Sequence, residues 1–416
     1  MRILVTTFGT LGDVRPYAAF GGALRERGHE VTLAVPEGFR DLADGVGVGM
    51  HPAGSRLLTM LQEVMPELGG PRDSLRTFGI LREAMRDHID EQWAAARAAR
   101  PDLVVYHPKC LAGPHIAEAL GVPGVLSVPL PFFTPTRAFP IPFLGGRSFG
   151  GRGNRASYAF TRAATVLYGG MINDFRRRIG LTPVGRLGDP LRNPDGSRVP
   201  VLYPYSRHVV PVPADFPPSA HVTGYWFLPH DPAWRPGRRL ADFLSAGEPP
   251  VYVGFGSMGF GKGADERRDA VLRALEANRL RGVVATGWGG LTAGTAPSDD
   301  VLVVDAVPHE WLFDRVAAVV HHGGAGSTAA GLRAGRPTLI CPFLGDQPFW
   351  GARVHGVGAG PAPLPARRLA EGLTSRLADL VRNEAYRQCA ARLGRSIRDE
   401  DGLGRGVAIL ESLVPA

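Results

Sequence analysis

Short apolar runs alternate with amphipathic helical patterns over the first third of the chain. Residues 3–5 and 31–35 are runs of mainly aliphatic and β-branched side chains, and each has the length of a buried strand. Between them, apolar residues recur at helical spacing, and Pro16 suits the first turn of that helix. Residues 103–106 and 124–128 repeat the strand pattern, with a helical segment between them. Strands that alternate with helices pair in parallel, so this pattern predicts a parallel sheet that helices cover on both faces.

The same alternation begins again near residue 251, after a proline-rich stretch. The predicted strands of this half are the apolar runs at 251–255, 282–285, 301–304, 318–320 and 338–340. The sequence therefore predicts an α/β protein with two Rossmann-like domains facing across a cleft, where ligands meet the carboxyl ends of the strands. The predicted units are a first domain at 1–205, a linker and start of the second half at 206–250, a second domain at 251–395, and a C-terminal helix at 396–416 that packs back toward the first domain.

Residues 129–170 interrupt the alternation. Residues 129–144 combine prolines with aromatic side chains, and a glycine-rich stretch follows at 145–153. This composition predicts a segment without regular structure, and we expect so apolar a loop to cover an apolar ligand. A predicted helix carries a second group of large apolar side chains, which line the same ligand site, pack in the core or form a shallow membrane-contact patch: Leu57, Leu58, Met60, Leu61 and Met65.

Composition and charge narrow the function classes. The chain has 416 residues, 44% of them apolar, which suffices for two domains with substantial cores. Its net charge is +8, but only Lys109 and Lys262 are lysines and the arginines are scattered, so a nucleic-acid partner is disfavoured. The three cysteines are too widely spaced for a disulfide framework or a zinc site. The apolar runs are shorter than a membrane span and the first is too short for a signal peptide, so we expect a cytoplasmic protein.

The strongest chemical motif covers residues 319–332. A predicted strand ends just before His322, a glycine-rich turn follows, and a helix is expected to begin near Ser327. Glycines let backbone amides approach an anion closely, and a helix N-terminus contributes about half a positive charge. His322, Gly324, Ser327 and Thr328 therefore predict a diphosphate site that needs no metal ion. The alternative is a capped turn in which the His322 imidazole is satisfied within the core.

Two further strand ends carry small or polar residues. Residues 254–259 form a glycine-rich turn around Ser257, which suits either a second approach to the same phosphates or a plain turn. Asp346 and Gln347 lie side by side beyond another predicted strand. A carboxylate beside a carboxamide matches the vicinal hydroxyl groups of a sugar, and it equally suits a capped turn before the next helix.

The loop after the first strand contains Asp13. This carboxylate is expected to face the cleft, where it can take a proton from a bound hydroxyl group. The alternative, which the sequence by itself favours, is that Asp13 caps the following helix. An aspartate ordinarily has a pKa of about 3.9, which is low for a group that must remove a hydroxyl proton. We therefore expect burial to raise the pKa of Asp13. His107, which follows the strand at 103–106, is a second candidate base, against a surface or capping role.

Together these motifs resemble the inverting family 1 glycosyltransferases, which use nucleotide-sugar donors and have the two-domain GT-B fold. The resemblance is greatest to the branch that contains sterol 3-β-glucosyltransferases and the glycosyltransferases of macrolide and glycopeptide antibiotics, and it covers nearly the whole chain. The segments that carry it are residues 12–16, 134–140, 223–226, 251–258, 286–291, 307–313, 321–328 and 345–350.

The resemblance implies a role for each matching residue. Asp13 matches the general base that deprotonates the acceptor hydroxyl. The residues that match the diphosphate site are His322, Gly324, Ser327, Thr328 and Ser257. Asp346 and Gln347 match the pair that binds the sugar hydroxyls. The backbone near Val307 matches the segment that binds the edge of the nucleotide base.

Two positions depart from the donor-binding pattern of the plant members. Ala306 stands where those enzymes have a tryptophan, and Ala330 stands where they have the glutamate that binds the ribose. The nucleotide base then needs another stacking partner, for which Trp288 and Trp311 are the candidates. The expected donor is a UDP-sugar, with glucose as the sugar and a dTDP-sugar as the alternative donor. No cofactor and no metal ion are expected, and the product would be a β-glycoside.

The expected acceptor is a hydroxyl group of a hydrophobic small molecule such as a sterol, polyketide, terpenoid or flavonoid. Two other functions stand beside this one. A non-catalytic auxiliary partner of a biosynthetic glycosyltransferase is disfavoured because both Asp13 and the phosphate loop are present. A nicotinamide-dependent oxidoreductase is disfavoured because Gly9 and Gly12 lack the GxGxxG spacing and the second strand ends without an acidic residue. The oligomeric state is left open.

Overall fold

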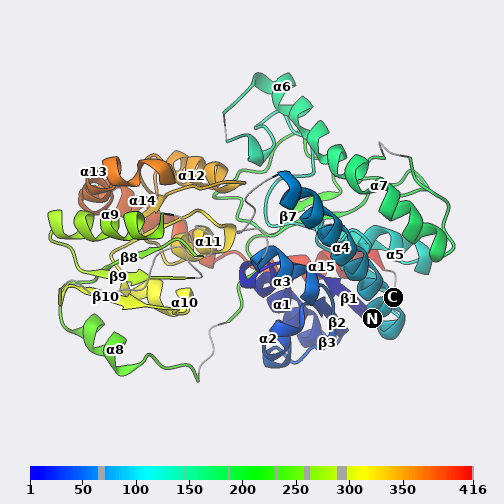
Figure 1. Ribbon diagram of the computed structural model, residues 1–416, viewed down its shortest axis with the longest axis horizontal. Coiled ribbons are helices and arrows are strands. Elements are labelled where there is room, and N and C mark those ends of the chain that lie inside the picture. The colour runs from blue at the N-terminus through cyan, green and yellow to red at the C-terminus, as the bar shows by residue number, and fades with distance from the viewer. Residues whose placement is uncertain are drawn as a thin grey trace.

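Two parallel β-sheets form the framework of the protein (Figure 1). The computed structural model describes residues 1–63, 71–145, 147–185, 188–229, 233–256, 263–287 and 298–414. The first sheet has the strand order β3-β2-β1-β4-β5-β6-β7, and the second has the order β10-β9-β8-β11-β12. All neighbouring strands in both sheets are parallel, so the predicted fold class is confirmed.

The first sheet contains four predicted strands and three that the sequence pattern missed. The predicted runs at 3–5, 31–35, 103–106 and 124–128 are confirmed as β1, β2, β4 and β5. The missed strands, β3, β6 and β7, are short and lie next to prolines, so they do not stand out as apolar runs. The strand bounds are β1 (Arg2–Thr6), β2 (Glu30–Val35), β3 (Gly49–Pro52), β4 (Leu103–Tyr106), β5 (Gly124–Ser127), β6 (Val201–Tyr203) and β7 (Ala220–Val222).

Helices connect these strands and cover the sheet. They are α1 (Leu11–Glu26), η1 (Glu37–Phe39), α2 (Arg40–Gly45), α3 (Ser55–Glu63), α4 (Pro71–Ala99), α5 (Gly113–Leu120), η3 (Pro142–Leu144), α6 (Gly150–Ser157), η4 (Tyr158–Phe160) and α7 (Thr161–Arg178), where η denotes a 3-10 helix. Helix α1 begins earlier than predicted: Thr10 is its N-cap, so Asp13 lies in its first turn and Pro16 lies inside the helix. Proline has no N–H group, so position 16 donates no helical hydrogen bond.

The second sheet contains all five predicted strands of the second half. They are β8 (Val251–Gly254), β9 (Gly282–Ala285), β10 (Val301–Val304), β11 (Ala318–His321) and β12 (Thr338–Ile340). The helices around them are α8 (Arg238–Ser245), α9 (Ala264–Ala277), α10 (His309–Leu312), η5 (Phe313–Arg315), α11 (Ala325–Arg333), α12 (Gln347–Gly356), η6 (Ala366–Arg368), α13 (Leu369–Arg382), α14 (Glu384–Arg398) and α15 (Gly402–Leu413).

The chain stays with the first sheet beyond the predicted boundary at residue 205. Strand β7 lies inside the predicted linker 206–250 and pairs with β6 through Tyr203 and Val222. Farther along, the Trp226 ring stacks on Phe20 of α1 at 4.0 Å between centroids. The Trp226 indole N–H also donates to the carbonyl of Gly402 in α15, at 3.1 Å. Helix α15 therefore packs on the first half, where Trp226 holds it.

The segment 129–170 is more regular than its composition predicts, because α6, η4 and α7 begin within it. The Asn154 amide donates to the carbonyl of Arg137 at 3.0 Å, and the Tyr158 hydroxyl donates to the carbonyl of Pro131 at 3.3 Å. These tertiary contacts offset the low helix propensity of glycine, which costs about 1 kcal/mol per residue. The prediction that this whole segment lacks regular structure is therefore wrong.

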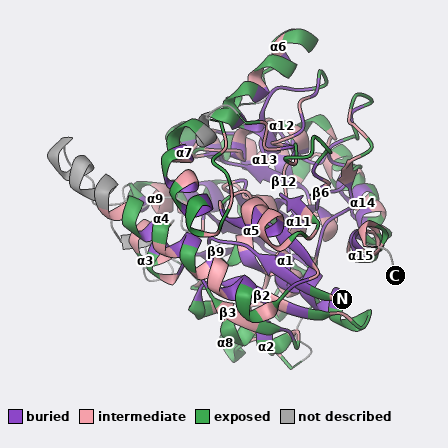
Figure 2. Ribbon diagram, turned by 90° about the vertical axis from the view of Figure 1, so that its right-hand side faces the viewer, coloured by how far each residue is buried: buried purple, intermediate pink, exposed green. Residues whose placement is uncertain are grey.

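Buried residues concentrate in the strands and on the helix faces that pack against them (Figure 2). Every residue of β4 and of β8 is buried, as expected for parallel strands with helices on both faces. One apolar cluster also continues from the first half into the second, because Phe139 contacts Phe349 of α12 with ring centroids 5.8 Å apart. The two halves are therefore packed directly against each other.

Candidate active site

Asp13 lies just beyond the carboxyl end of β1, in the first turn of α1. Its Oδ2 accepts a hydrogen bond from the backbone N–H of the N-cap residue Thr10, at 2.9 Å. Its Oδ1 lies 2.6 Å from Nζ of Lys109, in the loop after β4. The side chain is 24% exposed, so one carboxylate helps to cap α1 and also reaches solvent. The geometry thus combines the capping role with an accessible charged oxygen.

The pKa of Asp13 lies below its ordinary value, and the expectation of a raised pKa is wrong. Burial by itself raises the pKa, but the positive charge and hydrogen bond of Lys109 and the backbone hydrogen bond from Thr10 outweigh it. Asp13 is therefore ionised at neutral pH, in the form that accepts a proton. The sequence pattern could not reveal this because Lys109 lies 96 residues away along the chain.

His107 fixes the turn that carries Lys109. Its Nδ1 accepts a hydrogen bond from the backbone N–H of Lys109 at 3.1 Å, and its ring contacts the edge of Tyr17 at 5.9 Å between centroids. Burial lowers the pKa of His107 to about 3, with a further contribution from Lys109. A group this weakly basic is a poor proton acceptor, so the geometry favours a structural role for His107 over a second base.

The imidazole of His322 lies between glycines from two separate loops. A Cβ atom on Gly256, after β8, would be 3.2 Å from Cε1 of the ring, and a Cβ on Gly324, after β11, would be 2.6 Å from Nε2. Gly256 also has a φ angle of +59°, which favours glycine. A side chain at either position would therefore press against the imidazole, and the ring lies where the two strand-end loops meet.

His322 is a neutral group at neutral pH. Burial lowers its pKa to about 4, and the nearby His309 contributes in the same direction. Its Nδ1 is buried without a hydrogen-bond partner in the part of the chain that the structure describes. Such an atom is costly unless a ligand or water satisfies it. The ring can thus offer a neutral N–H donor to a ligand, rather than the positive charge that a protonated imidazole would supply.

Helix α11 begins at Ala325, with Gly324 as its N-cap, slightly before the predicted start. The Thr328 side chain is buried, and its hydroxyl donates to the carbonyl of Gly324 at 2.9 Å, so it holds the first turn together. Ser327 is half-buried in the same turn. The free backbone N–H groups of a first helical turn and the helix dipole form an anion site, and Ser327 adds a hydroxyl to it.

Asp346 and Gln347 occupy the start of α12. The Asp346 Oδ2 atom accepts a hydrogen bond from the Trp350 indole at 2.8 Å. The Gln347 Oε1 atom accepts from the backbone N–H groups of Phe343 and Leu344, at 2.8 and 3.1 Å. These bonds fix both side chains and leave the second oxygen of Asp346 and the amide nitrogen of Gln347 without a partner among the described residues.

Charged groups of the first half influence the pKa of Asp346 in the second half. Burial raises the pKa of Asp346, and the hydrogen bond from Trp350 and the positive charge of Lys109 oppose this rise. The negative charge of Asp13 makes a smaller contribution in the same direction as burial. Beside them, an ion pair joins Arg15 of α1 to Glu310 of α10, with 2.9 Å between Nη1 and Oε1. The two sheets therefore bring their carboxyl ends toward one region that contains charged groups from both halves.

The structure describes only some of the residues that are predicted to contact the nucleotide base. Val307 is half-buried between β10 and α10. Ser257 and Trp288 lie outside the described residues. The Trp311 ring packs 5.0 Å from that of Trp234 and lies 4.2 Å from the guanidinium carbon of Arg315. The partner that stacks on the base therefore stays a prediction.

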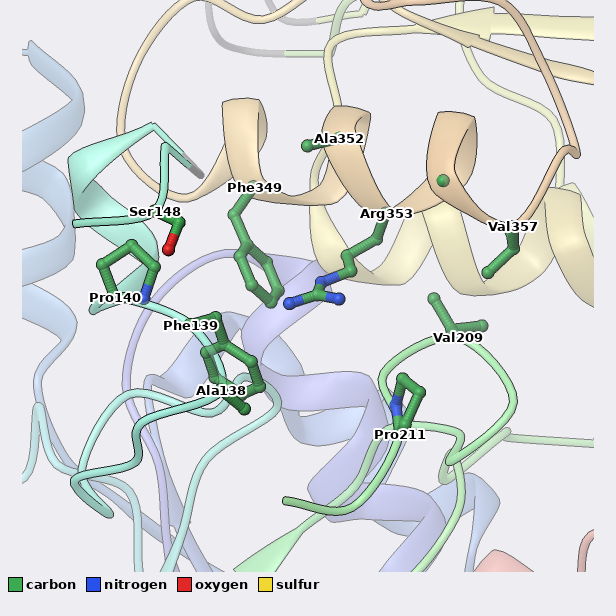
Figure 3. A pocket seen from close by; sticks show the side chains of 11 residues that line it. Ala138, Phe139, Pro140, Ser148, Val209, Pro211, Phe349, Ala352, Arg353 and Val357 are labelled. Carbon is green, nitrogen blue, oxygen red and sulfur yellow. The ribbon is translucent and has the colours of Figure 1, made fainter. Parts of the chain in front are cut away.

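A cavity of about 350 Å³ lies between the halves (Figure 3). Its walls come from the loop that contains Phe139 and from α12. Arg353 of α12 reaches into it, with its guanidinium carbon 4.9 Å from the centroid of Phe139 and 5.0 Å from that of Phe349. The cavity lining includes neither Asp13 nor Asp346, so this cavity is distinct from the candidate active site. Its contacts tie α12 to the first half.

The large apolar side chains of α3 form a core cluster in the first half. Leu57, Leu58, Met60 and Leu61 pack with Phe8, Ala84 and Cys110. Met65 lies outside the described residues. Of the roles expected for these side chains, packing in the core therefore accounts for Leu57, Leu58, Met60 and Leu61.

The sequence pattern missed two cations of this region, Lys109 and Arg15. Lys109 is one of two lysines in the chain and lies just after the end of a strand, which is a signal that points to it. Arg15 belongs to the motif at 12–16, but its partner Glu310 is remote in sequence. An ion pair between residues so far apart in the sequence can be identified only from the three-dimensional arrangement of the two halves.

Two family models match segments of this chain, and known proteins are similar to it over almost all of its length. The model of the glycosyltransferase family 28 N-terminal domain matches residues 3–140. The model of the erythromycin biosynthesis protein CIII-like C-terminal domain matches residues 290–400. The two matched segments contain Asp13 at one end of the chain and His322 and Asp346 at the other.

Two curated proteins are similar to the chain over almost all of its length. Sterol 3-beta-glucosyltransferase UGT80A2 of Arabidopsis thaliana is 34% identical over 100% of this chain, which spans 66% of that relative. O-mycaminosyltylonolide 6-deoxyallosyltransferase of Streptomyces fradiae is 34% identical over 99% of this chain and 97% of its own length. Among solved structures, the glycotransferase of kitacinnamycin has the same fold, with a TM-score of 0.73 and 18% identity over 99% of this chain and 98% of that one.

Proposed function

Because this chain belongs to the family 1 glycosyltransferases of the GT-B fold, related to sterol and antibiotic glycosyltransferases, we propose that it transfers a hexose from a nucleoside diphosphate sugar to a hydroxyl group of a hydrophobic small molecule. UDP-glucose is the favoured donor, and a dTDP-sugar is the alternative. The two curated relatives are named for a sterol and for a mycaminosyltylonolide, which supports a small-molecule acceptor of that class.

In the proposed reaction, the Asp13 carboxylate takes the proton of the acceptor hydroxyl while the acceptor oxygen attacks C1 of the sugar. The bond between C1 and the diphosphate oxygen breaks, and the nucleoside diphosphate leaves with the electron pair. Attack from the face opposite the leaving group inverts the configuration at C1, so an α-linked donor gives a β-glycoside. The ionised state of Asp13, which Lys109 favours, supports its role as the base.

The departing diphosphate gains negative charge, so the groups that stabilise it matter most in the transition state. We assign this task to the N-terminus of α11, the neutral imidazole of His322 and the hydroxyl of Ser327. Thr328 acts indirectly, because its hydroxyl holds the first turn of α11. Asp346 and Gln347 are assigned to the sugar hydroxyls through the oxygen and the nitrogen that their internal hydrogen bonds leave over.

The observation that carries this proposal is the approach of a base from one half to a sugar-binding candidate of the other. Arg15, two residues after Asp13 in α1, forms an ion pair with Glu310 of the other half at 2.9 Å, and the charges of Asp13 and Lys109 both influence the pKa of Asp346 at the start of α12. An anion-binding helix end in one half and an ionised carboxylate in the other are the two elements that a displacement at C1 requires.

A nucleotide-release assay tests the proposal directly. UDP-glucose and dTDP-glucose are each incubated with a sterol, a macrolide aglycone, a terpenoid alcohol and a flavonoid, and products are identified by mass spectrometry and NMR. We expect release of the nucleotide only with a matching acceptor, a β-linked product, and equal rates with and without EDTA. Binding of UDP without release for any pair would favour a non-catalytic partner, and loss of activity in EDTA would contradict a metal-free diphosphate site.

Replacing Lys109 with methionine should move the acid limb of kcat/KM to higher pH. The Lys109 ammonium helps to hold the pKa of Asp13 below its ordinary value, so its removal raises that pKa. A base is active when deprotonated, and a higher pKa means that protonation inactivates it at a higher pH. The measurement is kcat/KM from acid to neutral pH, with Lys109→Arg as the control that keeps the charge. Coincident profiles for the wild type and Lys109→Met would show that Asp13 is not the titrating base.

A further inference from the structure

The helical arm formed by Phe149, α6, η4 and the start of α7 has an exposed apolar face. Phe149, Phe160 and Leu167 are 55%, 60% and 62% exposed. Phe149 is the N-cap of α6 and lies against Gly153, where an added Cβ would be 2.8 Å from the Cβ of Phe149. Gly153, Phe160 and Leu167 follow one another at intervals of seven residues, which is the spacing of residues on one side of a helix. Three large exposed apolar side chains along one face are more than scattered surface residues require.

Contacts on the opposite side fix the orientation of the arm. Asn154 and Tyr158 are buried and hydrogen-bonded to the loop before the arm. The Ser157 hydroxyl accepts a hydrogen bond from the backbone N–H of Ile141 at 2.9 Å, on the same loop. In Figures 1 and 2, α6 stands out from the body of the molecule. The arm is thus anchored by one side and presents its apolar side outward.

The charged side chains of the arm itself are all positive, and one of them, Arg155, pairs with Asp215 at 3.6 Å. The sequence has no acidic residue between Glu118 and Asp174, whereas the same stretch contains five arginines: Arg137, Arg147, Arg152, Arg155 and Arg162. Arg152 and Arg162 are exposed, and they flank the apolar residues in the sequence of the arm. A second copy of this surface would place arginines against arginines, which disfavours self-association through it.

We propose that this arm docks the protein on an anionic phospholipid membrane. Phe149, Phe160 and Leu167 enter the boundary between headgroups and acyl chains, and the arginines pair with the lipid phosphates. Within the described residues, each helix is too short or too polar to cross a bilayer. The proposal does not depend on the sugar-transfer reaction, because binding to lipid needs neither donor nor acceptor.

Co-sedimentation of the full chain with lipid vesicles tests this docking. Vesicles of phosphatidylcholine with one third phosphatidylglycerol are compared with vesicles of phosphatidylcholine alone. We expect at least about tenfold stronger partitioning onto the anionic vesicles, and weaker partitioning at high salt, where screening shortens the reach of the arginines.

Two double variants separate the apolar and the charged contributions. F149S/F160S and R152E/R162E should each weaken binding to the anionic vesicles by at least about tenfold. The matched control for charge is R367E/R395E, which reverses two exposed arginines elsewhere, and the control for apolar exposure is Val212→Ser. Both controls should bind as the wild type does. Near-UV circular dichroism and UDP affinity verify that every variant is folded.

Three outcomes would overturn the proposal. The first is equal binding to both kinds of vesicle, and the second is wild-type binding by the folded arm variants. The third is a wild-type chain that ignores vesicles but dimerises in analytical ultracentrifugation, with F149S/F160S restoring the monomer. In that case the apolar face pairs with a second copy of the chain.

Discussion

Replacing Asp13 with asparagine is expected to lower kcat/KM for sugar transfer by roughly 10³-fold, while the affinity for UDP stays unchanged. The asparagine amide cannot take a proton from the acceptor hydroxyl, so the base is lost. The Asn carbonyl oxygen can still accept the hydrogen bond that Thr10 donates to Oδ2 of Asp13, so α1 remains capped. The groups assigned to the diphosphate lie in the other half of the molecule and keep their geometry.

Initial rates over a range of acceptor concentrations and calorimetric titration with UDP measure the two parts of this prediction. Thr10→Ala is the control, because it removes the side-chain contact to Asp13 at 3.4 Å and leaves the carboxylate in place. We expect that variant to stay within a few-fold of the wild type, since the loss of one cap contact affects mainly the helix. Wild-type turnover by Asp13→Asn would remove Asp13 from the mechanism.

The strands were predictable because a buried parallel strand is a continuous apolar run. Residues 103–106 and 338–340 coincide with β4 and β12, in which every side chain is buried. Helix α6 was not predictable, since glycines at 150, 151 and 153 weaken the local pattern. Hydrogen bonds from Asn154 and Tyr158 to the preceding loop stabilise it. Tertiary contacts outweigh local propensity there.

Some residues of the candidate site were likewise predictable from the sequence, and others were not. His322, Asp346 and Asp13 each follow a strand within a short motif, so sequence alone could single them out. Lys109 also follows a strand, but nothing in the sequence pairs it with Asp13, and the lowered pKa of Asp13 arises in part from this lysine 96 residues away. The sign of that pKa shift depends on which of two opposing effects is larger, and only the three-dimensional arrangement decides between burial and an opposite charge.

Replacing His322 with alanine is expected to lower kcat by roughly 10²-fold and to weaken UDP binding. The imidazole fills the space between Gly256 and Gly324, so alanine removes a hydrogen-bond donor and leaves that space unfilled. Steady-state kinetics and calorimetry with UDP measure both losses. His51→Ala, on strand β3 of the other half, is the matched control and should change neither quantity.

His322→Gln separates the hydrogen bond from the charge. With a pKa of about 4, the His322 imidazole is neutral near pH 7. A neutral amide N–H can therefore replace part of its function, and we expect His322→Gln to retain about tenfold more activity than His322→Ala. The ratio of wild-type to His322→Ala rates should also stay constant from about pH 5.5 to about pH 8, because the imidazole does not titrate there. A ratio that rises steadily as the pH falls through this range would mean that a protonated imidazole binds the diphosphate, and His322 would then act as a cation.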